Sequence, residues 1–207
     1  MARVKNGALD GFNGKLGPLV GYKWKGRDCV RTWTVPTDRK SPAQLERRRI
    51  FGKMSSLGAA MLPIAKVGLR GVAAENGTTE KNIFVRLNSH CASVVDDEVL
   101  IDYSGLAVAD GPLEAVDFGE PSTIAGRVVR ATFTPSASAD RFCYVVLAAY
   151  LPQARGCMLS EPVYRSTGTV ELTLPKAWAG MEAHLYGFCW DGKDSASPSC
   201  YVGVLVP

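Results

Sequence analysis

Three stretches of the chain carry residue types that could do chemistry: a glycine-rich loop with a lysine, a histidine beside a cysteine, and a serine-rich loop. The first, GFNGKLG at residues 11–17, has the Gly and Lys of a phosphate loop, but that loop requires GxxxxGK[ST] between a strand and a helix. Lys15 is followed by Leu16 and a strand-forming segment. We therefore expect these glycines to permit positive φ in turns, and we predict no cofactor.

The other two stretches give little support to enzymatic catalysis. His90 stands beside Cys91 in a segment predicted to be helical. Adjacent helical residues point about 100° apart, whereas Cys–His chemistry needs the two side chains within hydrogen-bond reach. His184 falls in a strand-like segment, and the serines between residues 195 and 199 lack a GxSxG motif. We predict no catalytic residues, no enzymatic activity and no small-molecule substrate.

The six cysteines, at positions 29, 91, 143, 157, 189 and 200, form no CxxC pair and no tight framework. Zinc sites need such clusters of Cys and His, so we predict no metal site. The chain is too large to depend on a disulfide framework. We expect most cysteines to be reduced, buried thiols. Cys189 and Cys200 are the pair that a hairpin could bring face to face.

Positive charge and aromatic residues are concentrated at the start of the chain. Residues 1–60 hold 13 Lys/Arg against 4 Asp/Glu, whereas residues 91–207 hold 7 against 14. Cations interleaved with aromatic side chains are typical of surfaces that bind single-stranded nucleic acid, and a basic surface can equally meet an acidic one on a neighbouring copy. The candidate partner-binding residues are Lys15, Tyr22, Lys23, Trp24, Lys25, Arg27, Arg31, Trp33, Arg47 and Arg48.

The sequence predicts no membrane-spanning segment. Its longest apolar runs, such as CYVVLAAYL at 143–151, fall far short of the roughly 20 residues that a membrane helix needs. The start, MARVKNGALDGFNGK, has no hydrophobic stretch of the kind found in secretory signals. We expect a cytoplasmic location and no membrane partner.

The first half of the chain predicts a hairpin followed by helices. Strand-like residues 17–24 and 28–35 are separated by a short glycine turn. Ser41 as N-cap, followed by Pro42 and Gln44, predicts the start of a helix. Apolar residues then recur as a stripe at the spacing of one face of an amphipathic helix: Leu45, Ile50, Phe51, Met54, Leu57 and Met61. Arg47–Arg49 and Lys53 lie mostly on the other face of this helix.

Two breaks and a second helix are predicted after this stripe. Pro63 should break or kink the first helix, and residues 67–79 are typical of a turn region. Thr78 or Thr79 can cap a second helix over residues 80–95.

From about residue 97, short strand-like runs alternate with Pro, Gly, Ser and Asp, which indicates an antiparallel β-sandwich. The runs lie within residues 98–113, 126–135, 141–152, 168–178, 181–191 and 199–207. Residues 142–151 are apolar on both sides, as in a central strand. The predicted fold is α+β: an N-terminal β-hairpin plus helices over residues 1–96, followed by an antiparallel immunoglobulin-like β-sandwich over residues 97–207.

The start of the chain also carries a recognisable pattern. Its members are Gly11, Phe12, Asn13, Gly14, Lys15, Leu16, Gly17, Gly21, Tyr22, Trp24, Gly26 and Arg31. This pattern, the segment SPAQLERRRIF at 41–51 and the end at 184–205 resemble an uncharacterised family of Bacteroidales proteins with a GFxGKxGxxxGYxWxG signature. A weaker likeness relates the basic start and the following helix to small phage and prophage structural proteins. Neither resemblance implies a catalytic residue.

Two functions remain open at this stage. The first is a non-enzymatic structural or assembly protein that binds a protein partner or a second copy, with a phage- or prophage-derived virion role as its most concrete form. The alternative is a nucleic-acid-binding protein that acts through the basic N-terminal region.

Overall fold

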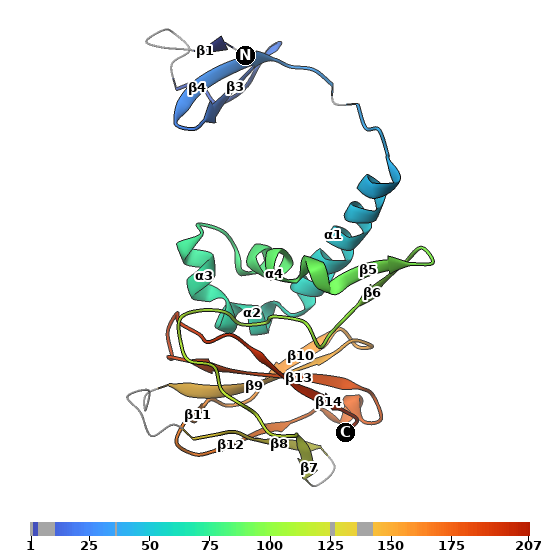
Figure 1. Ribbon diagram of the computed structural model, residues 1–207, viewed down its shortest axis with the longest axis vertical. Coiled ribbons are helices and arrows are strands. Elements are labelled where there is room, and N and C mark those ends of the chain that lie inside the picture. The colour runs from blue at the N-terminus through green and yellow to red at the C-terminus, as the bar shows by residue number, and fades with distance from the viewer. Residues whose placement is uncertain (1, 4–10, 36, 125–126, 136–142) are drawn as a thin grey trace. The chain divides into compact units, whose positions relative to one another are not determined.

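The structure is a computed structural model of the chain (Figure 1), and it describes residues 2–3, 11–35, 37–124, 127–135 and 143–207. The chain divides into two compact units, residues 1–41 and 42–207. We call them unit 1 and unit 2.

Unit 1 is a small antiparallel sheet. Its strands are β1 (Ala2–Arg3), β2 (Gly14–Leu16), β3 (Leu19–Trp24) and β4 (Arg27–Thr32), in the order β1-β4-β3-β2. Lys25 (φ 48°) and Gly26 (φ 75°) connect β3 to β4, and two successive positive φ angles are typical of a tight hairpin turn. The predicted hairpin is therefore confirmed, and two further strands extend it.

Unit 2 begins with four helices: α1 (Pro42–Ala60), α2 (Leu62–Gly68), α3 (Arg70–Glu75) and α4 (Glu80–Asn88). The predicted break is confirmed, because α1 ends before Pro63 and Pro63 lies in the first turn of α2. The Thr79 hydroxyl accepts a hydrogen bond from the Asn82 amide at 3.3 Å and caps α4, as predicted.

Two predictions for this segment are wrong. Residues 70–75 form α3 rather than a turn, because Ala73 of this short helix packs into the core. The second helix does not extend to residue 95: α4 ends at Asn88, a 3-10 turn η1 (Ser89–Cys91) follows, and the chain continues as β5 (Ala92–Val95) and β6 (Glu98–Ile101). Two residues with positive φ, Asp96 (49°) and Asp97 (66°), connect this hairpin.

The remaining strands form two antiparallel sheets. The larger contains β9 (Tyr144–Leu151), β10 (Gly156–Leu159), β13 (Ala183–Trp190) and β14 (Cys200–Leu205) in the order β10-β9-β13-β14, with β11 (Val163–Tyr164) also paired to β9. The smaller has the order β12-β8-β7 and contains β7 (Ser122–Ile124), β8 (Val128–Thr132) and β12 (Thr169–Thr173); a 3-10 turn, η2 (Lys176–Trp178), follows β12. Within 98–113 only β6 is a strand, so the second strand expected there is wrong.

The larger sheet is the middle layer of unit 2, between the helices and the smaller sheet (Figure 1). Alternate residues of β9 and β13 therefore serve two cores. Val146, Ala148 and Phe188 pack with the helices, while Val145 and Leu147 pack with the smaller sheet. This arrangement confirms that residues 144–151 form a central strand with both faces buried.

The structure is α+β, with antiparallel sheets throughout. Helices α1, α2 and α4 belong to the same compact unit as the two sheets because their buried residues share one core with β9 and β13. The division between compact units falls between Ser41 and Pro42, whereas the sequence suggested a boundary between residues 96 and 97. Among the described residues, no helix is long and apolar enough to cross a membrane.

Candidate functional site

The strand register of unit 1 places most of the candidate partner-binding residues on one face of its sheet. Residues opposite each other in an antiparallel pair lie on the same face. Lys15 pairs with Val20, and Val20 pairs with Arg31. Tyr22 pairs with Cys29, and Trp24 pairs with Arg27. We call this surface the basic aromatic face: Lys15, Val20, Tyr22, Trp24, Arg27, Cys29 and Arg31, together with Trp33, which follows β4.

Trp33 belongs to this face because its ring receives the Lys15 side chain. The Lys15 Nζ lies 3.8 Å from the ring centroid of Trp33, within cation–π range. The Trp33 amide donates to the Pro18 carbonyl at 2.7 Å, which holds the residue beside the sheet. Trp24 and Trp33 remain 48% and 43% exposed.

No carboxylate stands among these eight residues, whereas Asp28, the acidic residue of β3 and β4, pairs with Lys23 on the opposite face. Lys15, Arg27 and Arg31 are exposed and flank the two tryptophans. The face therefore offers positive charge and flat aromatic surface together. It can attract an acidic surface and can also bury planar groups.

Neither face of the sheet is fully open: Cys29 on the basic aromatic face is 2% exposed, and the opposite face is partly covered by Phe12. Gly21 is buried, and a Cβ atom at this position would collide with Phe12. Phe12 therefore packs directly on the backbone of β3, which requires glycine at position 21. The N-terminal pattern of glycine and aromatic residues thus has a packing role at this point.

The other predicted partner residues lie elsewhere. Lys23 is on the opposite face, and Lys25 is in the turn, with its Nζ 5.2 Å from the Trp24 ring centroid. Arg47 and Arg48 lie on α1, in unit 2, and are exposed. The structure thus gathers six of the ten predicted residues on one surface.

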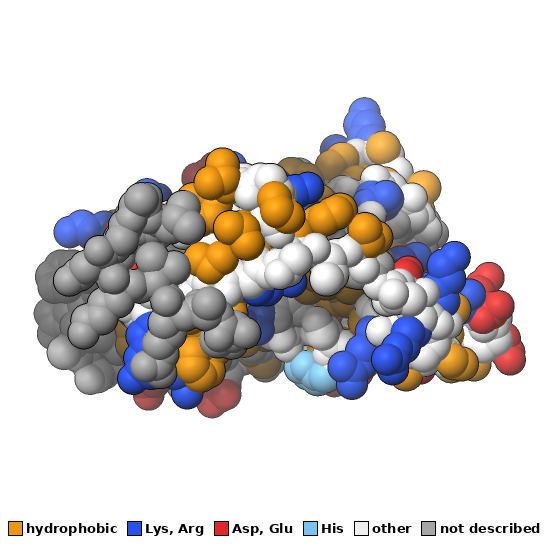
Figure 2. All heavy atoms as spheres, turned by 90° about the horizontal axis from the view of Figure 1, so that it is seen from above, with side chains coloured by type: hydrophobic (Ala, Val, Ile, Leu, Met, Phe, Trp, Pro, Cys, Tyr) orange, Lys and Arg blue, Asp and Glu red, His pale blue; other side chains and the backbone are white. Residues whose placement is uncertain are grey.

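The sequence prediction is wrong for part of the apolar stripe of α1. Met54, Leu57 and Met61 are buried, as expected, but Leu45 is 40% and Phe51 62% exposed. Buried residues of α1 occur only from Met54 onward, because the first turns extend beyond the core. Residues 42–53 therefore form a second exposed surface that mixes apolar and basic side chains. Figure 2 shows hydrophobic side chains at the surface next to Lys and Arg side chains.

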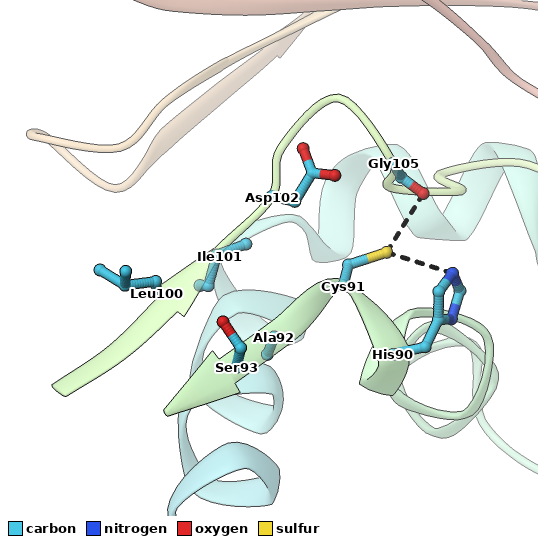
Figure 3. A pocket seen from close by; sticks show the side chains of 8 residues that line it. All are labelled: His90, Cys91, Ala92, Ser93, Leu100, Ile101, Asp102 and Gly105. Carbon is cyan, nitrogen blue, oxygen red and sulfur yellow. Dashed lines mark hydrogen bonds between the residues drawn. The ribbon is translucent and has the colours of Figure 1, made fainter. Parts of the chain in front are cut away.

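The His90–Cys91 pair lines a pocket of about 510 Å³ together with Asp102 (Figure 3). Here the sequence prediction is wrong: the Cys91 Sγ lies 3.4 Å from the His90 Nε2, because the two residues lie in the 3-10 turn η1 and not in a continuing α-helix. The thiol also donates to the Gly105 carbonyl at 3.2 Å.

The electrostatics of this pocket disfavour an activated cysteine. Burial and, second, the Asp102 carboxylate raise the pKa of the Cys91 thiol, whereas a nucleophilic cysteine needs a lowered pKa. The Asp102 carboxylate lies on the opposite side of Cys91 from the His90 ring (Figure 3). Its Oδ1 accepts from the Ser104 amide at 3.0 Å and the Ser104 hydroxyl at 2.6 Å, and these bonds lower the pKa of Asp102. The three groups therefore do not form a catalytic chain.

Two other motifs do not form the sites that their residue types suggested. Lys15 of the phosphate-loop-like segment lies in β2, and β3 follows it, so the strand–loop–helix geometry is lacking at this place. The six cysteines form no disulfide among the described residues, and this holds for Cys189 and Cys200 as well. No group of three His, Cys, Asp or Glu side chains suitable for a metal ion occurs in the described residues.

One comparison with known proteins gives a result. The family model DUF6266, a family of unknown function, matches residues 11–203, and the chain belongs to this family. No curated protein and no solved structure matched the chain. The matched range includes the basic aromatic face and most of unit 2, so the two units are parts of one family architecture.

Proposed function

We propose that this member of the family is a non-enzymatic assembly protein whose unit 1 docks on a protein partner through the basic aromatic face. The observation that carries the proposal is how little apolar surface the described residues of unit 1 bury. Among its described residues, Cys29 is the only apolar side chain that is buried, while Leu16, Trp24 and Trp33 are exposed. A small sheet that buries so little apolar surface gains stability by burying more against a partner.

The composition of the face fits a protein interface. Trp, Tyr and Arg are the residue types that most often dominate the binding energy of such interfaces. The face holds two Trp, one Tyr and two Arg. The exposed Leu45 and Phe51 on α1 add a second apolar surface in unit 2.

Charge favours a second copy of the chain as the partner. Residues 1–41 hold 9 Lys/Arg and 3 Asp/Glu, a net charge of +6, whereas residues 42–207 hold 15 and 17, a net charge of −2. Attraction between unit 1 of one copy and unit 2 of the next is a head-to-tail contact, which forms rings or filaments when repeated.

Light scattering over a salt series tests this assembly. Surface charges interact over about 30 Å at 0.01 M salt and about 3 Å at 1 M. We expect the mean mass to exceed that of one chain at low salt and to fall towards it as salt rises. A mass of one chain at every salt concentration and at high protein concentration would contradict self-assembly.

A second candidate function is nucleic-acid binding through the same face. It is favoured by the absence of carboxylates among the eight residues and by two exposed tryptophans on which bases could stack. Fluorescence anisotropy with labelled single-stranded DNA and RNA tests it. Binding should weaken steeply with salt; an unchanged anisotropy at low salt excludes this function.

The proposed origin and location of the protein rest on its resemblance to known proteins. The likeness to Bacteroidales proteins and to small phage structural proteins supports a bacterial cytoplasmic or virion protein. The neighbouring genes test the proposed virion role, because capsid or tail genes should lie beside the gene of a virion protein. An immunoglobulin-like arrangement of the two sheets of unit 2 is likewise a proposal, which comparison of strand connections with a solved family member would test.

A further inference from the structure

A small pocket in unit 2 brings together two cations and three hydroxyl groups from separate segments. Its volume is about 140 Å³. Lys53 and Ser56 come from α1, Tyr103 from the loop after β6, Tyr150 from β9, and Arg155 from the turn between β9 and β10. The remaining lining residues are Leu57, Ile101 and Pro152.

Arg155 is held in place at the mouth of this pocket. One of its terminal nitrogens, Nη2, donates to the Ser56 carbonyl at 3.2 Å and to the Ser56 hydroxyl at 2.5 Å. Its backbone has φ 50°, a left-handed conformation that glycine or asparagine adopts more readily than arginine. In the described part of the chain no carboxylate pairs with its guanidinium, so Nε and Nη1 remain available to a ligand.

Tyr150 presents an unpartnered hydroxyl to the pocket. The residue is only 3% exposed, yet its hydroxyl has no hydrogen-bond partner among the described residues. This oxygen is not one of the fully buried side-chain atoms that lack a partner in the described residues, so it is open to the pocket. Burial raises the pKa of Tyr150 to about 12, although the Arg155 charge acts in the opposite direction. The hydroxyl therefore keeps its proton at neutral pH and can donate it to an acceptor.

The charge of the pocket is positive. No Asp or Glu lines it. The nearest acidic residue along the chain, Asp102, lines the pocket of His90 and Cys91 and not this one. The Lys53 ammonium makes no ion pair with the described residues. An acceptor with several oxygens and negative charge would satisfy these donors together.

We propose that this pocket binds a phosphate group, either the free ion or a simple monoester. Arg155 offers its positive charge and the N–H donors on Nε and Nη1, and charge-assisted hydrogen bonds of guanidinium to phosphate are strong. Lys53 contributes charge, and the hydroxyls of Tyr150 and Tyr103 donate to further oxygens. A cavity needs about 10–15 Å³ to hold one water molecule, so a pocket of about 140 Å³ has room for a phosphate group. The site is in unit 2 and does not depend on the function proposed for unit 1.

Isothermal titration of the full chain with sodium phosphate tests this site, with sodium chloride at matched ionic strength as the reference. We expect saturable binding of phosphate alone. Arg155→Gln should weaken it at least about tenfold, since a hydrogen bond to a charged group contributes about 1.5–3 kcal/mol. Tyr150→Phe should weaken it several-fold, and Lys53→Gln should do the same.

Matched variants control for fold and for overall charge. Lys81→Gln removes one positive charge from α4, and Tyr164→Phe removes a hydroxyl from a half-exposed tyrosine; both should bind phosphate like the unchanged chain. Near-ultraviolet circular dichroism checks that every variant is folded. Phenyl phosphate distinguishes the two proposed ligands. If it binds more tightly than inorganic phosphate, the ligand is a monoester; if it binds more weakly, the ligand is the free ion. No saturable phosphate binding, or equal binding by the Arg155→Gln and Lys81→Gln variants, would overturn the proposal.

Discussion

Units 1 and 2 differ in where their large apolar side chains lie. Unit 2 buries them in two cores on either side of β9 and β13. Unit 1 has its tryptophans at the surface, and of its described apolar side chains only that of Cys29 is buried. The difference indicates that unit 2 is the stable body of the protein, and it fits our proposal that unit 1 is a surface for a partner. Four predictions test this division, from the largest expected effect to the smallest.

The largest effect should come from the core of unit 2. Phe188 is fully buried between β13 and the helices, and replacing a buried Phe with Ala costs about 3–5 kcal/mol. We expect Phe188→Ala to lower the free energy of unfolding in urea by this amount. Phe51→Ala is the matched control, because Phe51 is 62% exposed and should change stability by less than about 0.5 kcal/mol. Equal losses would contradict the assignment of the core.

Alkaline pH should destabilise unit 2 through Tyr150. Burial raises the pKa of its hydroxyl to about 12 in the folded protein, against about 10 when unfolded. The protonated phenol therefore contributes stability that is present below pH 10 and is lost as pH rises towards 12. The total is about 3 kcal/mol. Urea unfolding from pH 9 to 12 should show a shallower decline for Tyr150→Phe than for the unchanged chain; parallel declines would refute this.

Acidic pH should lower the stability of unit 2 by a smaller amount, through protonation of His184. Burial lowers the pKa of this imidazole, while Glu182 opposes the shift. Its Nδ1 lies 2.9 Å from the Tyr201 hydroxyl, and its ring stacks on Tyr103 at 4.4 Å. Folding therefore favours the neutral imidazole. His184 contributes to the stability of the fold above pH 6.5, and this contribution falls as the pH drops below 6.5. His184→Gln should flatten the stability profile between pH 7 and 5; an unchanged slope would count against this role.

The smallest effect on stability is expected from removing unit 1. Unit 2 is compact by itself, and its own helices and sheets supply the described residues of its two cores. A chain that begins at Pro42 should therefore unfold in one cooperative transition with nearly the midpoint of the full chain, measured by calorimetry. A loss of cooperativity, or a large fall in the midpoint, would show that unit 2 depends on unit 1.

Local patterns predicted much of the fold. The hairpin signal around Gly26, the break at Pro63 and the cap at Thr79 are all confirmed, because turns and caps depend on residues close in the sequence. The continuous apolar run before residue 151 predicted a central strand for the same reason. The antiparallel character of the second half followed from strand-like runs separated by turn residues.

Predictions that depended on tertiary packing were less successful. Leu45 and Phe51 follow the helical stripe, but the core ends at Met54, which no local pattern reveals. Residues 92–95 continue an apolar helical pattern, yet they pair with β6. Tyr150 and Arg155 come together with α1 only through the sheet, so their pocket had no signal in the sequence.

The candidate interface was predicted in composition but not in geometry. Its cations and aromatic residues could be read from the sequence, whereas the strand register was needed to separate Arg31 from Lys23. These two residues lie on opposite faces of one sheet and carry the same charge. That difference provides the most direct test of the docking surface.

Sedimentation analysis of Arg31→Gln and Lys23→Gln at low salt makes this test, since each variant removes one positive charge from β3 or β4. If the basic aromatic face docks on a second copy, Arg31→Gln should weaken self-association about tenfold, corresponding to about 1.4 kcal/mol, while Lys23→Gln should behave like the unchanged chain. Equal weakening by the two substitutions would mean that net charge and not this face drives assembly. No weakening by Arg31→Gln would contradict the docking surface.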